Sequence, residues 1–359
     1  MNQFQKLNLS IPLIQGGMGI GVSLSNLAGS VAAQGAMGVI STANPGYNHK
    51  DFWKNPIACN LEALRFHVQR AKEMAKGQGA VAVNAMVATT HYTEMVTMAI
   101  QSGVDAVISG AGLPLQLPSI PGADKIALAP IVSGAKAIST ICKFWDKRFG
   151  RVPDFVVVEG SKAGGHLGFS KEELLDGTAK PLTVLVKEVA QALAPWQEKY
   201  NRTIPVFGAG GVMSGQEIAQ LEQQGAYGAQ IATSFIATEE CDASEGYKQA
   251  ILKAKPEDVQ IVQSPVGMPG RALASPLLEK LKKAGRLAPT GCVNCLSHCN
   301  PATTPYCITH ALIEAVKGNW EQGLFFCGAN VGKVQTMTTV PALIKRLTEE
   351  WTQAKQATI

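Results

Sequence analysis

Short apolar runs rich in β-branched residues alternate with longer amphipathic stretches over the first two-thirds of the chain. A strand buried on both faces has a continuous apolar sequence, whereas a helix on a sheet repeats its apolar residues every three or four positions. The predicted strands cover residues 12–15, 38–41, 80–84, 106–109, 127–132, 155–159, 204–208 and 229–233. The predicted helices cover residues 24–34, 60–76, 92–101, 134–149, 182–194, 215–224 and 243–253.

This alternation predicts an α/β fold, for which two architectures compete. Strand–helix units repeated eight times within about 250 residues match a TIM (β/α)8 barrel. A doubly wound open sheet would place the spacing G-x-G-x-x-G after its first strand and an acidic residue about twenty positions later. The sequence after the first predicted strand, Gly16-Gly17-Met18-Gly19, has neither feature. We therefore predict the TIM barrel.

The pattern changes near residue 263, where prolines, glycines and cysteines replace the alternation. We predict a barrel over residues 1–262 and a Cys-rich, partly helical C-terminal extension over residues 263–359 that packs on it. Helices are expected near residues 306–317 and 341–356. No flexible linker separates the two parts, so the extension is not expected to form an independent domain.

Composition excludes several classes of protein. Apolar residues make up 46% of the chain and charged residues 16%, which is typical of a globular enzyme and not of a disordered chain. The net charge of +5 is mild and the basic residues are scattered, so no nucleic-acid surface is expected. No apolar run reaches the membrane-spanning length of about 18 residues, and the first ten residues lack the apolar core of a signal peptide. We expect a cytoplasmic protein that binds no membrane.

A glycine-rich turn after the predicted strand 155–159 is the strongest functional signal. It reads Ala163-Gly164-Gly165-His166. Barrel enzymes carry their catalytic groups at the carboxyl ends of the strands, and glycines let backbone approach a ligand closely. We predict that His166 is a general base or acid, because a neutral imidazole can accept a proton at neutral pH. The alternative is a loop histidine that only forms hydrogen bonds.

A second glycine turn follows the next predicted strand. Gly210 and Gly211 precede a predicted helix, and the following strand ends in Gln230-Ile231-Ala232-Thr233. Loops after the seventh and eighth strands commonly form the phosphate site of a TIM barrel, and a helix N-terminus favours an anion. These two segments predict a phosphate-bearing cofactor. The alternative is a tight turn next to ordinary core.

Residues at the ends of the first and third predicted strands complete the expected site. Gln15, Gly16, Gly17 and Met18 are expected to line its mouth. Asn84 could hydrogen-bond an aromatic heterocycle through both its donor and its acceptor, or simply cap backbone groups.

Four cysteines cluster in the extension at the spacing C-x2-C-x3-C-x7-C: Cys292, Cys295, Cys299 and Cys307. Thiolates at such distances can bind zinc or an iron–sulfur cluster. However, the spacing matches neither a standard ferredoxin nor a zinc ribbon, and free cysteine is often simply buried. We therefore expect structural cysteines and assign no metal ligand, with metal binding as the alternative.

Four motifs in this order resemble the nitronate monooxygenase (2-nitropropane dioxygenase-like) family, whose superfamily includes flavin-dependent enoyl-ACP reductases. They are IPLIQGGM at 11–18, AGGH at 163–166, GAGGV at 208–212 and QIAT at 230–233. The resemblance covers about residues 8–255 and implies a TIM barrel with non-covalent FMN. It implies His166 as the catalytic residue and the following flavin contacts: Gln15, Gly16, Gly17, Met18, Asn84, Glu159, Ala163, Gly164, Gly165, Gly210, Gly211, Gln230, Ile231, Ala232 and Thr233.

The chain departs from the family pattern at two positions. Lys162 stands where an acidic residue is common, and its side chain could either stabilise an anionic reduced flavin or point to solvent. Ala232 replaces a glycine that is common in the phosphate-binding segment. The replacement keeps the backbone N–H that would contact a phosphate. The best-known members of the family lack the Cys-rich extension, so the resemblance says little about the substrate of this chain.

The resemblance implies oxidation of alkyl nitronates with O2 to a carbonyl compound and nitrite. The alternative is an NAD(P)H-dependent reductase of enoyl-ACP or enoyl-CoA thioesters, with His166 as the proton donor. A flavin-binding barrel without turnover and a sugar-phosphate isomerase are further alternatives. The expected partners are therefore small molecules, and a homodimer is left open.

Overall fold

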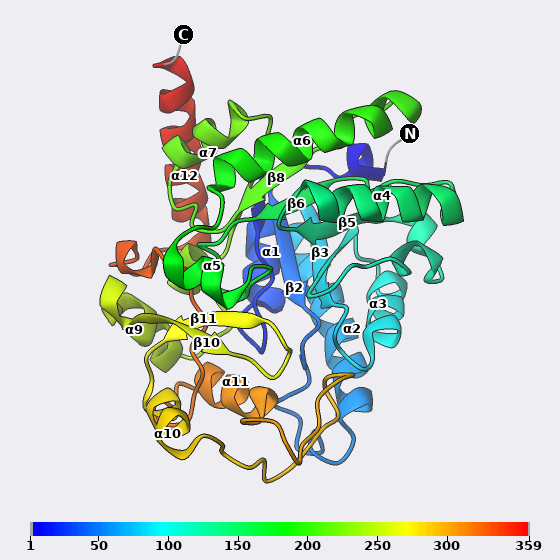
Figure 1. Cartoon of the computed structure of the whole chain (residues 1–359). Coiled ribbons are helices and arrows are strands. Elements are labelled where there is room, and N and C mark those ends of the chain that lie inside the picture. Colours follow the sequence, from blue (N-terminus) through cyan, green and yellow to red (C-terminus); the bar gives the residue numbers. More distant parts are fainter. Residues whose placement is uncertain (1–2, 358–359) are drawn as a thin grey trace.

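A computed structural model describes residues 3–357, and within them eight parallel strands close into a barrel (Figure 1). The order around the barrel is β1-β2-β3-β4-β5-β6-β8-β9, and β1 closes it by pairing with β9. The predicted TIM barrel is confirmed. The barrel strands are β1 (Leu13–Gln15), β2 (Met37–Ser41), β3 (Ala80–Met86), β4 (Ala106–Gly110), β5 (Ala127–Val132), β6 (Val156–Glu159), β8 (Val206–Ala209) and β9 (Gly228–Ile231).

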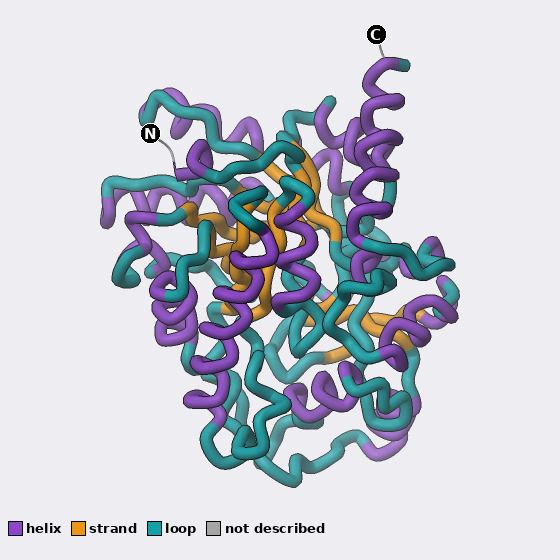
Figure 2. Tube along the Cα trace, turned by 180° about the vertical axis from the view of Figure 1, so that it is seen from behind, coloured by secondary structure: helices purple, strands orange, loops and turns teal. Residues whose placement is uncertain are grey.

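Helices surround the barrel, as the view from behind shows (Figure 2). They are α1 (Ser25–Ala33), α2 (Pro56–Ala75), α3 (Tyr92–Gln101), α4 (Ala135–Phe149), α5 (Lys171–Asp176), α6 (Leu182–Lys199), α7 (Gly215–Glu222), α8 (Thr233–Ile236) and α9 (Glu245–Lys253). The sequence missed the short helices α5 and α8. It also extended the last strand to residue 233, whereas β9 ends at Ile231 and Thr233 begins α8.

Aromatic side chains close the amino-terminal end of the barrel. Phe4 lies in a short 3-10 helix (Gln3–Lys6), and its ring centroid is 5.4 Å from that of Phe155 and 6.0 Å from that of Phe207. All three side chains are buried. Because this end is filled, the carboxyl end is the one that can receive a ligand.

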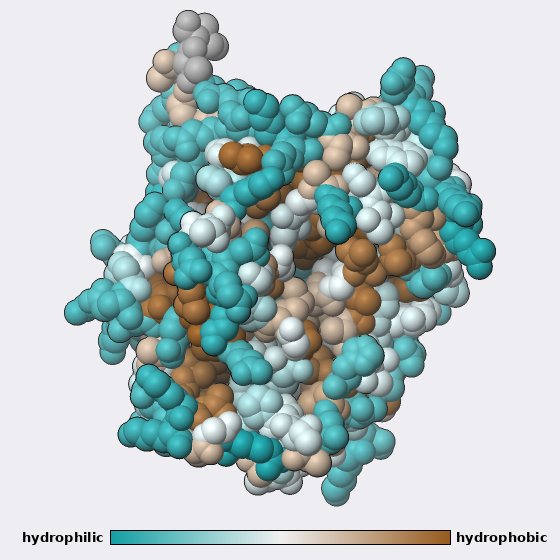
Figure 3. Space-filling model, in the orientation of Figure 1, coloured by the Kyte–Doolittle hydropathy of each residue, from teal (hydrophilic) through white to brown (hydrophobic). Residues whose placement is uncertain are grey.

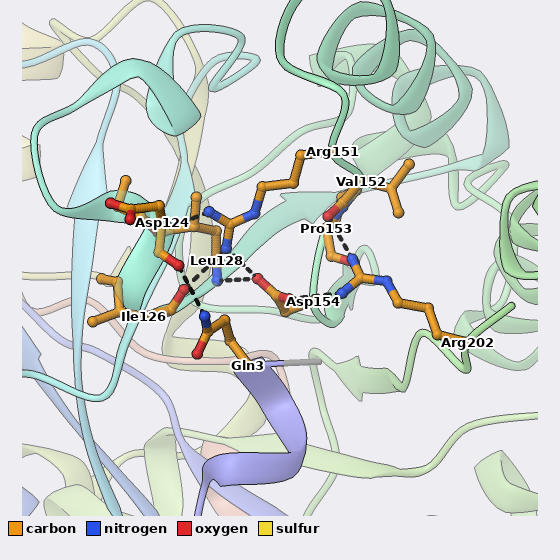
Figure 4. Close-up of polar contacts among 10 residues, drawn as sticks. Gln3, Asp124, Ile126, Leu128, Arg151, Val152, Pro153, Asp154 and Arg202 are labelled. Atoms are coloured by element: carbon orange, nitrogen blue, oxygen red, sulfur yellow. Dashed lines mark hydrogen bonds and ion pairs between the residues drawn. The ribbon is translucent and has the colours of Figure 1, made fainter. Parts of the chain in front are cut away.

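A buried ion-pair network ties together the segments that lead into β5 and β6 (Figure 4). Asp154 is 1% exposed, and its carboxylate accepts from the Leu128 N–H at 3.0 Å. It also accepts from Arg151 at 2.6 Å and from Arg202 at 3.0 Å. The two arginines donate further to four backbone carbonyls, so the network links several loops and holds this part of the barrel rigid, although the buried Nε of Arg202 has no partner within the described residues.

The extension contains strands that the sequence did not reveal. β10 (Val259–Gln263) and β11 (Pro269–Leu273) form an antiparallel hairpin. β11 also pairs with β7 (Gly165–His166), which belongs to the predicted glycine turn. The extension thus adds a small sheet below the carboxyl end of the barrel (Figure 1). The hairpin begins before residue 263, so it spans the predicted boundary.

Three longer helices complete the extension: α10 (Pro276–Ala284), α11 (Ile308–Val316) and α12 (Val340–Gln356). The sequence predicted α11 and α12 but missed α10. Helix α12 runs along α7, where Gly215 donates its N–H to Glu350 at 2.8 Å and the Trp351 indole donates to Glu222 at 2.8 Å (Figure 1). Within residues 3–357, no helix is both long and apolar enough to span a membrane.

Candidate active site

A cavity of about 690 Å³ lies at the carboxyl end of the barrel strands. Apolar side chains gather around a hollow in the middle of the face shown in Figure 3. The cavity brings together all the predicted site residues except one: Gly16, Gly17, Met18, Asn84, Glu159, Ala163, Gly164, Gly165, His166, Gly210, Gly211, Gln230, Ile231, Ala232 and Thr233. Residues that are far apart in the sequence therefore line one cavity.

Gln15 is the exception, because its side chain is buried in the wall of the barrel. Its amide nitrogen donates to the carbonyl of Gly16 at 2.5 Å, and its oxygen accepts the N–H of Val39 at 3.0 Å. The residue is 0% exposed and does not line the cavity. The carboxamide holds β1 to β2, so the expectation that Gln15 lines the mouth is corrected.

His166 is fixed by the hairpin of the extension. It pairs with Gly270 of β11, and its ring lies 5.2 Å from the Phe326 ring in an edge-on arrangement. Its Nε2 lies 2.7 Å from the Oγ of Ser264, which is itself buried in the turn after β10. Among the residues that the structure describes, Nδ1 has no hydrogen-bond partner. Nδ1 is therefore the ring nitrogen left for a ligand.

Burial controls the protonation of His166. Removal of the imidazole from water lowers its pKa from 6.5 to about 4, because the charged form loses hydration without gaining a carboxylate partner. The ring is therefore neutral at pH 7. If Nε2 carries the proton and donates it to Ser264, then Nδ1 is free to act as a base.

A carboxyl group and a guanidinium group lie behind the glycine turn. Burial raises the pKa of Glu159 to about 8, and the charge of Arg271 opposes this rise. Arg271 is 8% exposed and donates to the carbonyls of Ser161 at 2.6 Å and Ala163 at 2.5 Å. The arginine thereby clamps the turn that carries His166.

The glycines of the site are required by close packing between loops. A Cβ on Gly164 would collide with the backbone of Cys327. Gly210 and Gly211 have φ of +98° and +89°, and a Cβ on Gly210 would lie 2.7 Å from the Gly160 carbonyl oxygen. These positions let the two predicted glycine turns and the extension meet at one point.

Several polar groups of the cavity lack partners in the protein. The Oε1 of Gln230 is buried, and no donor contacts it within the described residues. Likewise, no acceptor from residues 3–357 contacts the N–H groups of Gly211 and Val212. Thr233 accepts the Gly328 N–H at 2.9 Å, which leaves its own hydroxyl proton to donate. This set of donors and one acceptor fits a heteroaromatic ligand that ends in a phosphate.

Sequence reasoning missed the residues that the extension contributes, because nothing in the irregular sequence after residue 263 predicted where they lie. Asn330 of the extension donates to the Gly211 carbonyl at 2.6 Å, and the carbonyl of Phe326, also in the extension, accepts from Tyr247 of α9 at 2.9 Å. Lys162, by contrast, is exposed and does not line the cavity, so its side chain points to solvent. No group of three or more His, Cys, Asp and Glu side chains in residues 3–357 is placed to hold a metal ion.

Comparisons with known proteins place this cavity in context. A model of the family described as nitronate monooxygenase matches residues 2–350. The chain belongs to the nitronate monooxygenase family. A probable nitronate monooxygenase of Staphylococcus saprophyticus is 28% identical over 299 residues, covering 77% of this chain and 79% of the relative. One from Bacillus subtilis is 23% identical and covers 98% of this chain and 99% of the relative.

Solved structures share the fold of this family member. FabK from Thermotoga maritima superposes with a TM-score of 0.74 at 22% identity, over 98% of this chain and 96% of that chain. A nitroalkane oxidase from Streptomyces ansochromogenes superposes with a TM-score of 0.72 at 20% identity, over 99% of this chain and 100% of that chain. The chain is an oxidoreductase, and its family uses a flavin.

Proposed function

We propose that this protein binds FMN and oxidises alkyl nitronates with O2 to a carbonyl compound and nitrite. The observation that carries the proposal is the glycine-lined cavity at the carboxyl end of the barrel, which holds the unpartnered Oε1 of Gln230 and the half-buried imidazole of His166. FMN would supply the redox chemistry that couples oxidation of the substrate to reduction of dioxygen. The remaining steps are binding, orientation and proton transfer by this chain's own residues.

FMN fits the groups around the cavity better than FAD. The unpaired backbone donors of Gly211 and Val212 and the Thr233 hydroxyl would hold a terminal phosphate. Gly328 and Asn330 close the cavity against these same segments. Asn84, Glu159 and Gln230 would contact the heteroaromatic ring from the wall of the cavity.

The pKa of His166 favours the nitronate as the substrate. A base with a pKa of about 4 removes a proton from a neutral nitroalkane less readily than an ordinary histidine would. A nitronate is already deprotonated and avoids this step. An enoyl reductase needs a proton donor. A neutral imidazole is a poor proton donor at pH 7.

Reduction of an enoyl thioester is the second candidate, because the cavity extends beyond the glycine turns. Its wall continues past Leu113 to Lys136 and Thr140 of α4, which leaves room for a long acyl substrate. In this reaction NAD(P)H would reduce the flavin, and His166 would protonate the substrate.

The two functions are separated by anaerobic mixing of the flavin-loaded protein with NADH, NADPH or propionate-3-nitronate. Bleaching of the flavin by the nitronate, followed by release of nitrite on admission of O2, supports the proposed function. Bleaching only by NADH or NADPH, with reoxidation by an enoyl thioester, would establish the reductase instead.

A further inference from the structure

A second cavity, of about 70 Å³, adjoins the candidate active site, and we call it the side cavity. It lies between the loops after β2 and β3 and the irregular segment 285–307, which joins α10 to α11. The side cavity and the main cavity share Ala43, Met86, His166 and Leu312 in their walls. His166 therefore borders two spaces, of which the proposed function has used one.

The extension covers the side cavity with fixed backbone. Val293 lines the side cavity and is only 6% exposed. The Thr90 N–H donates to the Cys295 carbonyl at 3.2 Å, and the Ser297 N–H donates to the Ala88 carbonyl at 3.0 Å, so the segment is held against the loop after β3. Long irregular segments are uncommon in compact proteins and are usually functional. Enclosing the side cavity is a function that this segment can have.

The polar side chains in the wall of the side cavity are mostly paired with protein groups. Asn60 donates to the Oδ1 of Asn44 at 2.9 Å, and Asn44 donates to the Thr309 hydroxyl at 3.3 Å. The Thr89 hydroxyl donates to the Met86 carbonyl at 2.7 Å. Most of the other lining residues are aliphatic or methionine. Because a buried water needs about two to four polar partners, this wall favours an apolar occupant over water.

The volume of the side cavity sets the size of that occupant. An apolar cavity of about 150 Å³ stays dry and can bind benzene or xenon. The side cavity has about half that volume, but it exceeds the roughly 10–15 Å³ that one water-sized molecule requires. A diatomic gas or a xenon atom therefore fits, whereas a flavin ring does not.

We propose that the side cavity binds O2 and supplies it to the active site past His166. This inference rests on the proposed function, in which dioxygen is the oxidant. Gly211, Val212 and Thr233, which would hold the phosphate, line the main cavity but not the side cavity. O2 in the side cavity would therefore not compete with the cofactor for space.

The side cavity also gives O2 its own route from solvent. Pro56, Ile57 and His91 line the side cavity and not the main cavity, and all three are partly exposed. O2 can therefore enter beside α2 and α3 while a substrate or a product still occupies the main cavity. An apolar branch of the substrate is the competing occupant, and the experiments below distinguish the two.

The first test locates a gas without any turnover. Crystals of the flavin-loaded protein are pressurised with xenon, and the xenon atoms are found by their anomalous scattering. We expect a xenon atom in the side cavity, in contact with Val293 and Leu312. Val293→Phe fills this space and should abolish the peak. Ordered waters throughout the side cavity, or xenon in the main cavity alone, would overturn the proposal.

The second test measures the reaction with O2 separately from the reaction with substrate. The bound flavin is reduced with dithionite and mixed with O2 in stopped flow, which gives a second-order rate constant for reoxidation. Val293→Phe should lower this rate constant about tenfold, which corresponds to about 1.4 kcal/mol of activation free energy. Val266→Phe fills the side cavity from the β10–β11 turn and should act alike; it is half-buried, so it tests the site even if Val293→Phe does not fold.

Ile313→Leu is the matched control. Ile313 packs in the same apolar cluster as Val293 but lines neither cavity, and the exchange keeps the side-chain volume. This variant should keep both the xenon peak and the rate of reoxidation.

Reduction of the flavin by ethylnitronate separates this proposal from the proposed function. If the nitronate reduces the wild type and both filling variants equally well, slower reoxidation in the variants supports the oxygen site. Unchanged reoxidation in both variants, or an equal loss in reduction by the nitronate, would overturn it. A wild-type protein that the nitronate does not reduce would refute the proposed function, whereas the xenon peak and the reoxidation rates would still decide the oxygen site.

Discussion

Replacement of His166 with alanine tests the mechanism most directly, because two related substrates should respond differently. A positioned general base contributes about 10²–10⁴-fold to a proton transfer. Burial has already lowered the pKa of His166 from 6.5 to about 4, so its basicity is reduced. We therefore expect a loss near the lower end, about 100-fold, in the turnover of a neutral nitroalkane.

A preformed nitronate needs no deprotonation, so its oxidation should lose much less. The imidazole would then contribute only a hydrogen bond to the substrate, worth about 0.5–1.5 kcal/mol. That free energy corresponds to a loss of about 2- to 12-fold in kcat/KM. The assay is the rate of flavin reduction in anaerobic stopped flow, with nitroethane and ethylnitronate as the substrate pair.

The pH dependence supplies a second, independent readout. In the wild-type protein, nitroalkane turnover should fall only as the pH approaches about 4, because the imidazole is neutral above that value. His166→Ala should lack this acid limb, and the surface variant His49→Ala should keep it. Equal losses on the two substrates would refute the base role. An acid limb near pH 6.5 would refute the effect of burial, and loss of flavin from the variant would indicate a structural role.

Four further predictions follow from contacts described above. The carboxyl of Glu159 ionises near pH 4.5 in the unfolded chain but only near pH 8 in the folded protein, so the free energy of unfolding falls as the pH rises between these values. Relative to the wild type, Glu159→Gln should therefore raise the free energy of urea unfolding of the flavin-free protein at pH 8 but not at pH 4. Asp154→Ala leaves two half-buried guanidinium groups without their carboxylate partner and should cost about 3–5 kcal/mol by the same assay. A change below about 1 kcal/mol would show that water replaces the carboxylate. Ser264→Ala should lower nitronate kcat/KM by about 2- to 12-fold without changing flavin content, since it removes one hydrogen bond to His166; an unchanged value would mean that packing alone holds the ring. Chromatography of the flavin released by denaturation should identify FMN, and recovery of FAD would contradict the proposed phosphate site.

The barrel could be predicted from the sequence because most of its strands are short, mainly apolar runs whose boundaries are set by neighbouring residues. The predicted helix 92–101 matches α3 at both ends, and β5 matches the predicted strand 127–132. The glycine turns at 163–166 and 210–211 also marked the cavity correctly, since glycine next to a strand end is a local signal. Burial and strand period are properties of a short window of sequence.

The contribution of the extension could not be predicted, because it depends on pairing between distant segments. β7 has only two residues, and its partner Arg271 is more than a hundred positions away. The role of Gln15 was also hidden, since a carboxamide after an apolar run looks the same whether it faces a ligand or Val39. Such contacts are decided by tertiary packing, which periodicity does not encode.

The pairing of β7 with β11 also bears on how the protein matures on the ribosome. Domains generally fold from the N-terminus as the chain is synthesised. The barrel strands leave the ribosome first, but the turn that carries His166 gains its partner strand only when residues 269–273 emerge. The glycine at position 164 meets Cys327 later still. A newly made barrel therefore has an incomplete site, and stable loading of the cofactor should wait until nearly the whole chain has been translated.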